Sequence, residues 1–151
     1  MILLALDAST TAVGWALFDD GDYLESGVYV PKGDDWVERV MSIGAWLYDS
    51  DLEYDDLGLE LATGNKGNMH TNRLLGAVEY EIRQFCKLHE IDLHTVTASQ
   101  VKATGCHKDA IPVAVGIAER PMHYMHPGDE ADAIGVALAV IKKVRRERAY
   151  G

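Results

Sequence analysis

Cysteine is scarce in this chain, whose 151 residues contain only Cys86 and Cys106. Two cysteines are too few for the disulfide framework of a small secreted domain. The sequence also lacks an apolar run of the roughly 20 residues that a membrane-spanning helix needs. Its first residues have the pattern of a strand, without the basic segment and cleavage site of a signal peptide. We therefore expect a cytoplasmic protein with no membrane partner.

Positive charge is scarce in the first part of the chain. Residues 1–62 hold 14 of the 24 acidic residues but only 2 of the 14 lysines and arginines, and the formal net charge is −10. Because phosphate contacts need lysine and arginine, this acidic total argues against a simple nucleic-acid binder. A basic face built from the second part stays possible, since Lys142 to Arg148 is a basic cluster. The alternative is that the acids serve solubility and that the cluster is a solvated helix end.

Internal repeats and low-complexity segments are absent, and a chain of this length is typical of one domain, here 1–151. Apolar runs bounded by turn residues predict five strands, at 2–8, 14–18, 23–30, 57–61 and 91–96. The residues Asp19 to Asp22 form a strong hairpin turn between the second and third strands. The first three strands should therefore form an antiparallel meander.

Helical patterns alternate with the later strands. Asp35 has the character of an N-cap, with Glu38 three residues further on. A long helix should carry a stripe of Leu74, Val78, Ile82 and Phe85. Shorter helices are expected at 98–102 and near Pro112, and a largely apolar helix from about Asp129 to Arg148. This order predicts an α/β fold with a mixed five-stranded sheet flanked by helices.

Four carboxylates lie at the ends of apolar segments. Asp7 follows the apolar run 2–6, Glu60 closes the run 57–61, and Asp129 and Asp132 precede the apolar residues 133–141. A buried charge without a partner is costly, so three such segments indicate one shared site that holds a cation. Mg²⁺ prefers oxygen ligands and often binds carboxylates together with substrate phosphates. Two such ions can assist the displacement at a phosphodiester.

Each carboxylate can also be accounted for without any function. Asp129, Glu130 and Asp132 would complement the dipole at a helix N-terminus. Glu60 could face water at a strand end. Asp7 is the hardest to account for in this way, because it follows five apolar residues and precedes a turn.

A family resemblance links these segments. The residues 4–16, LALDASTTAVGWA, resemble the opening motif of the RuvC family of Holliday-junction resolvases. Leu59-Glu60 resembles the second acidic strand of that family, and residues 99–102 resemble the start of its basic helix. Residues 129–133, DEADA, resemble its closing acidic motif. The four motifs stand in the family order and span nearly the whole chain.

The resemblance implies an RNase H-like fold and a homodimer that cuts four-way DNA junctions with Mg²⁺, for which Mn²⁺ could substitute. Its catalytic and metal-binding carboxylates would be Asp7, Glu60, Asp129 and Asp132. Lys102 matches a basic residue near the DNA backbone, and Lys108 approximately matches a second. The setting would be the cytoplasm of a bacterium or of a phage-infected cell.

Two features depart from the family pattern. Cellular members place an aromatic wedge three residues after the second acid, where this chain has Thr63. Met69 or His70 could replace that wedge. Family members are also usually basic, whereas this chain is acidic. The two departures indicate a divergent member, such as a phage protein, with an altered substrate preference.

Other interpretations stay open at this point. Cys106 with His107, His123 and His126 lacks a recognised zinc spacing, although a histidine could assist proton transfer or contact phosphate. The loop 64–68 with Lys66, followed by Arg73, could line a DNA groove or simply join a strand to a helix.

Two alternative functions also fit parts of the sequence. The residues 6–11 are similar to the phosphate-binding opening of the actin-like ATPases and of a non-catalytic partner in tRNA threonylcarbamoylation. Those relatives need a longer chain with a second, duplicated domain. An RNase H-like nuclease that acts on RNA is the other alternative.

Overall fold

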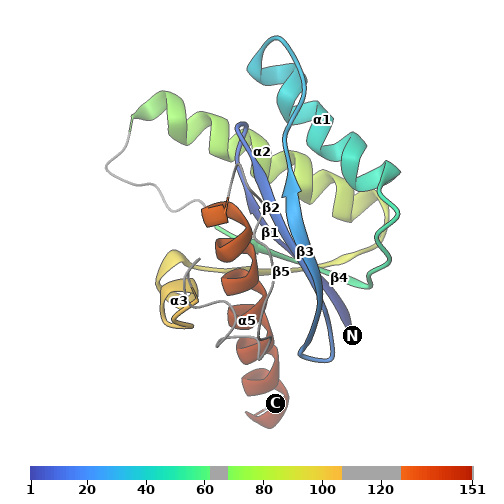
Figure 1. The fold of residues 1–151 in the computed structure, drawn as a ribbon, viewed down its shortest axis with the longest axis vertical. Coiled ribbons are helices and arrows are strands. Elements are labelled where there is room, and N and C mark those ends of the chain that lie inside the picture. Colours follow the sequence, from blue (N-terminus) through green and yellow to red (C-terminus); the bar gives the residue numbers. More distant parts are fainter. Residues whose placement is uncertain (62–67, 107–126, 151) are drawn as a thin grey trace.

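The computed structural model describes residues 1–61, 68–106 and 127–150. They form a five-stranded sheet in the order β3-β2-β1-β4-β5 (Figure 1). The strands β1 to β3 pair antiparallel, whereas β1 with β4 and β4 with β5 pair parallel. The predicted mixed sheet is thus confirmed. The strand bounds are β1 Ile2–Ala8, β2 Val13–Asp19, β3 Asp22–Tyr29, β4 Asp56–Glu60 and β5 Asp92–Val96.

Two tight turns build the meander, and the sequence specifies both. Ser9 Oγ accepts hydrogen bonds from the backbone N–H groups of Thr11 and Ala12, each at 3.2 Å, which turns the chain between β1 and β2. Between β2 and β3, Asp20 and Gly21 both have positive φ, of 48° and 92°. This is the geometry that a two-residue hairpin of right-handed twist requires, and it explains the Asp-Gly pair.

The helices α1 (Trp36–Asp49) and α2 (Met69–Leu88) cover one face of the sheet. Asp35 caps α1, because its side chain accepts from the Glu38 N–H at 2.8 Å, as predicted. On α2 the buried residues repeat at helical spacing, and Leu74 is only half-buried at the end of the predicted stripe. This layer packs on alternate apolar residues of β1, namely Leu4 and Leu6.

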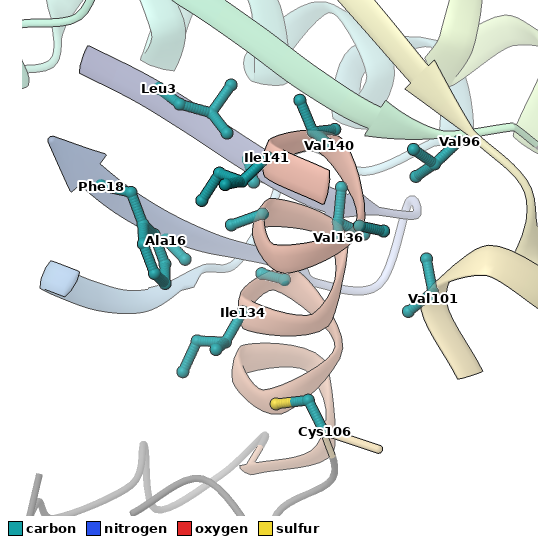
Figure 2. Packing of buried hydrophobic residues seen from close by; sticks show 14 of the residues in the cluster. Leu3, Ala16, Phe18, Val96, Val101, Cys106, Ile134, Val136, Val140 and Ile141 are labelled. Atoms are coloured by element: carbon teal, nitrogen blue, oxygen red, sulfur yellow. The ribbon is translucent and has the colours of Figure 1, made fainter. Parts of the chain in front are cut away.

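The helix α5 (Pro127–Tyr150) packs on the opposite face, beside the short α3 (Ala98–Lys102), as Figure 1 shows. Leu3 and Phe18 of the sheet and Ile134 and Val140 of α5 belong to the core of this layer (Figure 2). Because this core lies on the apolar stripe of α5, the helix is held along the sheet. Its N-terminal end therefore has a fixed position relative to β1 and β2.

The predicted elements agree with the structure wherever it describes them. Strand ends differ by at most one residue, and α5 begins two residues earlier and ends two residues later than predicted. The Thr97–Gln100 capping box that starts α3 was not predicted. The helix expected near Pro112 lies outside the described residues. In the described part of the chain, no helix has the length and apolarity needed to span a membrane.

Candidate active site

Asp7 lies near the end of the central strand β1, on the face that α5 covers. Side chains alternate along a strand, so Asp7 points to the same face as Leu3 and Ala5, which belong to the α5 core. Its pairing partner on β2 is Gly14. The side chain of Asp7 is half-buried. The apolar strand therefore delivers one carboxylate to the junction of sheet and helix.

Glu60 reaches the same place from the neighbouring strand. In the parallel β1–β4 pair, Leu6 is opposite Leu59, so Asp7 and Glu60 are the next residues of two adjacent strands. Leu57 and Leu59 pack in the α1–α2 layer, and alternation turns Glu60 to the α5 face. Both acids thus lie at the carboxyl ends of parallel strands, on one side of the sheet.

The N-terminal end of α5 comes close to these two strands because Gly14 has no side chain. A Cβ atom on Gly14 would overlap the backbone carbonyl of Asp129. Asp129 is half-buried and Asp132 is exposed, and the i, i+3 spacing puts them on one side of the helix. Gly14 thus permits the close approach that brings the two aspartates to Asp7.

The pKa shifts show that the four carboxylates interact electrostatically. The pKa of Asp7 is raised to about 8, first by burial and then by the charges of Asp132, Asp129 and Glu60. Burial and the charge of Asp132 raise the pKa of Glu60, while Lys102 lowers it. Burial and the charge of Asp129 raise the pKa of Asp132. Four carboxylates from three elements therefore share one region of excess negative charge.

This region has the ligand chemistry of a site for a hard cation. All its side-chain donors are carboxylate oxygens, which Mg²⁺ and Mn²⁺ accept. A bound cation would relieve the repulsion that raises these pKa values. Within residues 1–61, 68–106 and 127–150, however, no group of three or more His, Cys, Asp or Glu side chains is arranged closely enough to hold a metal ion. The carboxylate oxygens are thus suitable ligands for such a cation, whereas the side chains are too far apart to coordinate one ion together.

Glu130, between the two aspartates, lies in the first turn of α5, where an acid complements the helix dipole. It is also 1% exposed and accepts a hydrogen bond of 2.5 Å from Ser26 Oγ on β3. Ser26 Oγ lies 2.9 Å from the hydroxyl of Tyr23. This chain of three side chains fixes the start of α5 to the edge of the sheet. The sequence alone does not predict this buried contact of Glu130, because exposed acids are common in the first turn of a helix.

The predicted basic residues fall into three groups. Lys102, at the end of α3, lies close enough to influence the pKa of Glu60. Arg73 is exposed on α2 and is not among the charges that shift the pKa of Asp7, Glu60 or Asp132. Lys66, Lys108 and Thr63 lie outside the described residues, as do His107, His123 and His126.

The two cysteines are thiols inside the protein core. Both thiols are free and buried, and burial raises the pKa of Cys86 and of Cys106 to about 11. The charge of Asp132 raises the pKa of Cys106 further, and its Sγ lies 3.4 Å from the Ala131 carbonyl. Both therefore stay protonated at neutral pH, which makes them poor nucleophiles.

This topology, with its antiparallel meander and parallel strands between helical layers, is the RNase H-like fold. Thermus thermophilus RuvC bound to a Holliday junction matches with TM-score 0.77 and 17% identity, over 97% of this chain and 96% of that chain. A second Thermus thermophilus RuvC structure gives TM-score 0.72 and 16% identity, covering 97% of each chain. The Fowlpox virus resolvase, also bound to junction DNA, gives 0.50 and 14%, over 95% and 99%. No protein-family profile and no curated protein sequence matches the chain.

The predicted resemblance is confirmed at the level of the fold. The aligned length is nearly complete for both chains, so this chain has the same fold as RuvC. At 17% identity, the activity and the residue roles do not follow from the likeness alone. They have to be argued from the carboxylates of this chain.

Proposed function

We propose that this protein is a divalent-metal-dependent endodeoxyribonuclease that cuts Holliday junctions or related branched DNA. One observation carries the proposal: Asp7, Glu60, Asp129 and Asp132 converge on one face of an RNase H-like sheet, and the pKa of Asp7 is raised to about 8. A cluster of partly buried acids is energetically costly unless cations compensate their charge. Such a cost is expected at a site that holds metal ions during function.

The four carboxylates would be the ligands of Mg²⁺, with Mn²⁺ as a possible substitute. When bound, such ions supply an activated water and stabilise the leaving oxygen of the phosphodiester. Asp7 and Glu60 would hold their oxygens rigidly, because each is at the end of a buried strand. Asp129 and Asp132 would close the site from α5, whose start Glu130 fixes against Ser26.

Lys102 would act on the substrate side of the site. Its charge lowers the pKa of Glu60, so it lies near the carboxylates without pairing closely with one of them. A cation in that place can neutralise a phosphate of the scissile strand and place it against the acids. Lys108, Lys66 and Arg73 stay predictions as further DNA contacts.

A homodimer would match the two symmetric cuts that resolve a junction, since one site serves each of two opposed strands. The T. thermophilus RuvC and Fowlpox virus resolvase neighbours are complexes with Holliday-junction substrate, which supports branched DNA as the substrate class. The actin-like and tRNA-modifying alternatives are not favoured, because a RuvC structure aligns with 97% of this chain and over 96% of its own length.

The test is a substrate panel of a four-way junction, a flap, a linear duplex and a structured RNA, each with Mg²⁺, Mn²⁺ or EDTA. We expect metal-dependent nicking of the junction or the flap, and none by Asp7→Asn. Cleavage of RNA alone would contradict the DNA assignment in favour of an RNA nuclease. No cleavage of any substrate would contradict the nuclease assignment itself.

A further inference from the structure

A cleft between α3 and α5 gathers positive charge in this acidic protein. Its volume is about 380 Å³, and Ser99, Gln100, Ala103, Ala139, Lys142, Lys143, Arg146 and Glu147 line it. Three cations therefore face one carboxylate, although the chain as a whole has a net charge of −10. The cleft is open to solvent on the side of α5 that α3 flanks. A ligand with several negative charges would be attracted to it.

Two of the three cations are available to a ligand. Lys143 is half-buried, and its Nζ donates to the Thr95 carbonyl at 2.9 Å, which ties α5 to β5. Lys142 and Arg146 are exposed and stand at i and i+4, so they are neighbours on the helix surface. Within the described part of the chain, neither forms an ion pair with a carboxylate. Their spacing suits two phosphates of one nucleic-acid strand.

The cleft and the carboxylates lie on the same side of α5. Asp132, Ala139 and Arg146 are spaced by seven residues, which places them on one helix face with a drift of about 20° per step. From Asp132 to Arg146 the rise is about 21 Å at 1.5 Å per residue. That length equals roughly six base pairs of duplex at 3.4 Å each. Lys102, at the end of α3, lies between the two regions, since its charge reaches Glu60.

We propose that the α3–α5 cleft binds the phosphate backbone of a DNA arm, about six base pairs from the phosphate held at the carboxylates. Lys142 and Arg146 supply the charge, and the Ser99 hydroxyl and the Gln100 amide supply neutral donors. Contacts of this kind carry no base specificity and fix the position of the duplex. The inference rests on the proposed function, because it takes the carboxylates as the site of cleavage.

The same helix offers a matched control for charge. Arg145 and Arg148 point toward the β2–β3 turn and not into the cleft: Arg145 Nη2 lies 3.4 Å from the Asp20 carbonyl, and both arginines lower the pKa of Asp20. The double variants Lys142→Ala/Arg146→Ala and Arg145→Ala/Arg148→Ala each remove two positive charges. Only the first pair lines the cleft.

Binding is measured by fluorescence anisotropy, with both doubles made in the Asp7→Asn chain and with EDTA present, over a range of salt concentrations. The probes are four-way junctions with arms of about 16 base pairs, and junctions with hairpin-closed arms of about 4 base pairs, too short to reach the cleft at about 3.4 Å per pair. For the long arms, Lys142→Ala/Arg146→Ala should weaken binding about tenfold and reduce the salt slope by nearly 2. For the short arms it should change binding less than about twofold, as should the control pair on either probe.

Equal losses in the two doubles would overturn the proposal, since they would reflect net charge alone. Unchanged DNA binding by Lys142→Ala/Arg146→Ala would also overturn the proposal. An acidic protein segment would then be the next ligand to test in the cleft. Failure of the nuclease proposal is seen separately, as absence of nicking by the unmodified chain. In that case the same anisotropy series on linear duplexes of about 8 and 20 base pairs still decides whether the cleft binds DNA.

Discussion

At the scale of single residues, Asp7 is the side chain that links the fold to its proposed chemistry. Asp7→Asn keeps the size of the side chain and removes its charge. We expect it to reduce metal-dependent nicking by at least about 100-fold, because losing a metal ligand should cost more than losing an outer hydrogen-bond partner. In EDTA at neutral pH, the same change should raise thermal stability by about 1–2 kcal/mol, or roughly 3–6 °C, since it removes a carboxylate that is disfavoured first by burial and then by its acidic neighbours. Nicking assays and thermal unfolding of the same preparations check both effects.

The pH dependence follows from the direction of the pKa shift. The pKa of Asp7 rises from 3.8 in the unfolded chain to about 8 in the folded one. An acid with a raised folded pKa adds stability below its unfolded pKa, and this stability is lost as the pH rises through the folded value. In EDTA, the unmodified protein should therefore lose stability relative to Asp7→Asn between about pH 4 and pH 8.

Mg²⁺ provides the control for this titration. With saturating Mg²⁺, the carboxylates should stay ionised and bound to the metal. The unmodified chain should then regain the stability that it loses toward pH 8 in EDTA, whereas Asp7→Asn should not show this gain. Unfolding temperatures measured from about pH 4 to pH 9, with and without the metal, give the comparison. Parallel curves for the two proteins in EDTA would contradict the assigned repulsion.

Gly14 is the residue whose replacement should disturb the site without touching a carboxylate. A methyl group at Gly14 would collide with the Asp129 backbone, so Gly14→Ala should cost about 1–3 kcal/mol and push the start of α5 away from β2. Nicking should fall along with stability. Gly128→Ala, one residue before Asp129, meets open space and serves as the control, with no loss expected. Chemical denaturation and nicking rates separate the two variants.

Sequence reasoning identified the acidic residues better than their surroundings. Asp7 and Glu60 could be placed because a carboxylate at the end of an apolar strand is costly unless it binds a cation or faces water. The burial of Glu130 could not be predicted, since it depends on Ser26, a residue 104 positions earlier in the chain. The close approach at Gly14 was equally invisible, because only the packed helix shows what a Cβ atom would meet.

At the scale of elements, the position of α5 decides the geometry of the site. Its first turn is held by Glu130, Ser26 and Tyr23, and its middle by the apolar core (Figure 2). Ser26→Ala would leave the buried Glu130 carboxylate without this donor, which should cost about 1–3 kcal/mol. Tyr23→Phe removes only the outer hydroxyl and should cost less, about 0.5–1.5 kcal/mol.

The role of this hydrogen-bond chain is positioning rather than chemistry. We therefore expect Ser26→Ala to raise the Mg²⁺ concentration needed for half-maximal nicking while leaving the rate at saturating metal within a few-fold of normal. Ser42→Ala, which removes two hydrogen bonds on α1 in the opposite layer, is the stability control. If Ser26→Ala changed stability but not the metal requirement, the chain of hydrogen bonds would be structural only.

Elements were predictable wherever local chemistry specifies them. The Asp-Gly hairpin, the Asp35 cap and the period of the buried residues in α2 are local signals, and each agrees with the structure. The mixed sheet order followed from alternating strands and helices. Exact helix ends did not follow, because the first and last turns of α5 depend on packing against other elements.

At the scale of the whole molecule, the uneven charge has a structural counterpart. The acidic first part supplies α1 and most of the meander, whereas the available cations of the α3–α5 cleft lie on the other face of the sheet. The acidic total that argued against nucleic-acid binding is therefore compatible with a DNA-facing side. Sequence counting could show the asymmetry, but only the fold places the cleft cations on the layer opposite α1.

The remaining surface question is where a second copy of the chain would bind. On α2, Met69 and Tyr80 are exposed, and Gly76 lies between them, where an added methyl group would meet no atom within 4 Å. An exposed glycine inside a helix costs about 1 kcal/mol relative to alanine, so its presence suits a close approach by another helix. We expect α2 to form the interface of the proposed homodimer.

Tyr80→Glu tests this interface, because a charge in place of a central aromatic should weaken the dimer by at least about 30-fold. Sedimentation velocity at micromolar concentration should show a dimer for the unmodified chain and a monomer for Tyr80→Glu. Leu24→Glu, at an exposed apolar residue of β3, should remain dimeric. The monomer should cut one strand of a junction without the paired cut on the opposite strand. A dimer that survives Tyr80→Glu would place the interface elsewhere, and an unmodified chain that is monomeric even on junction DNA would contradict the homodimer.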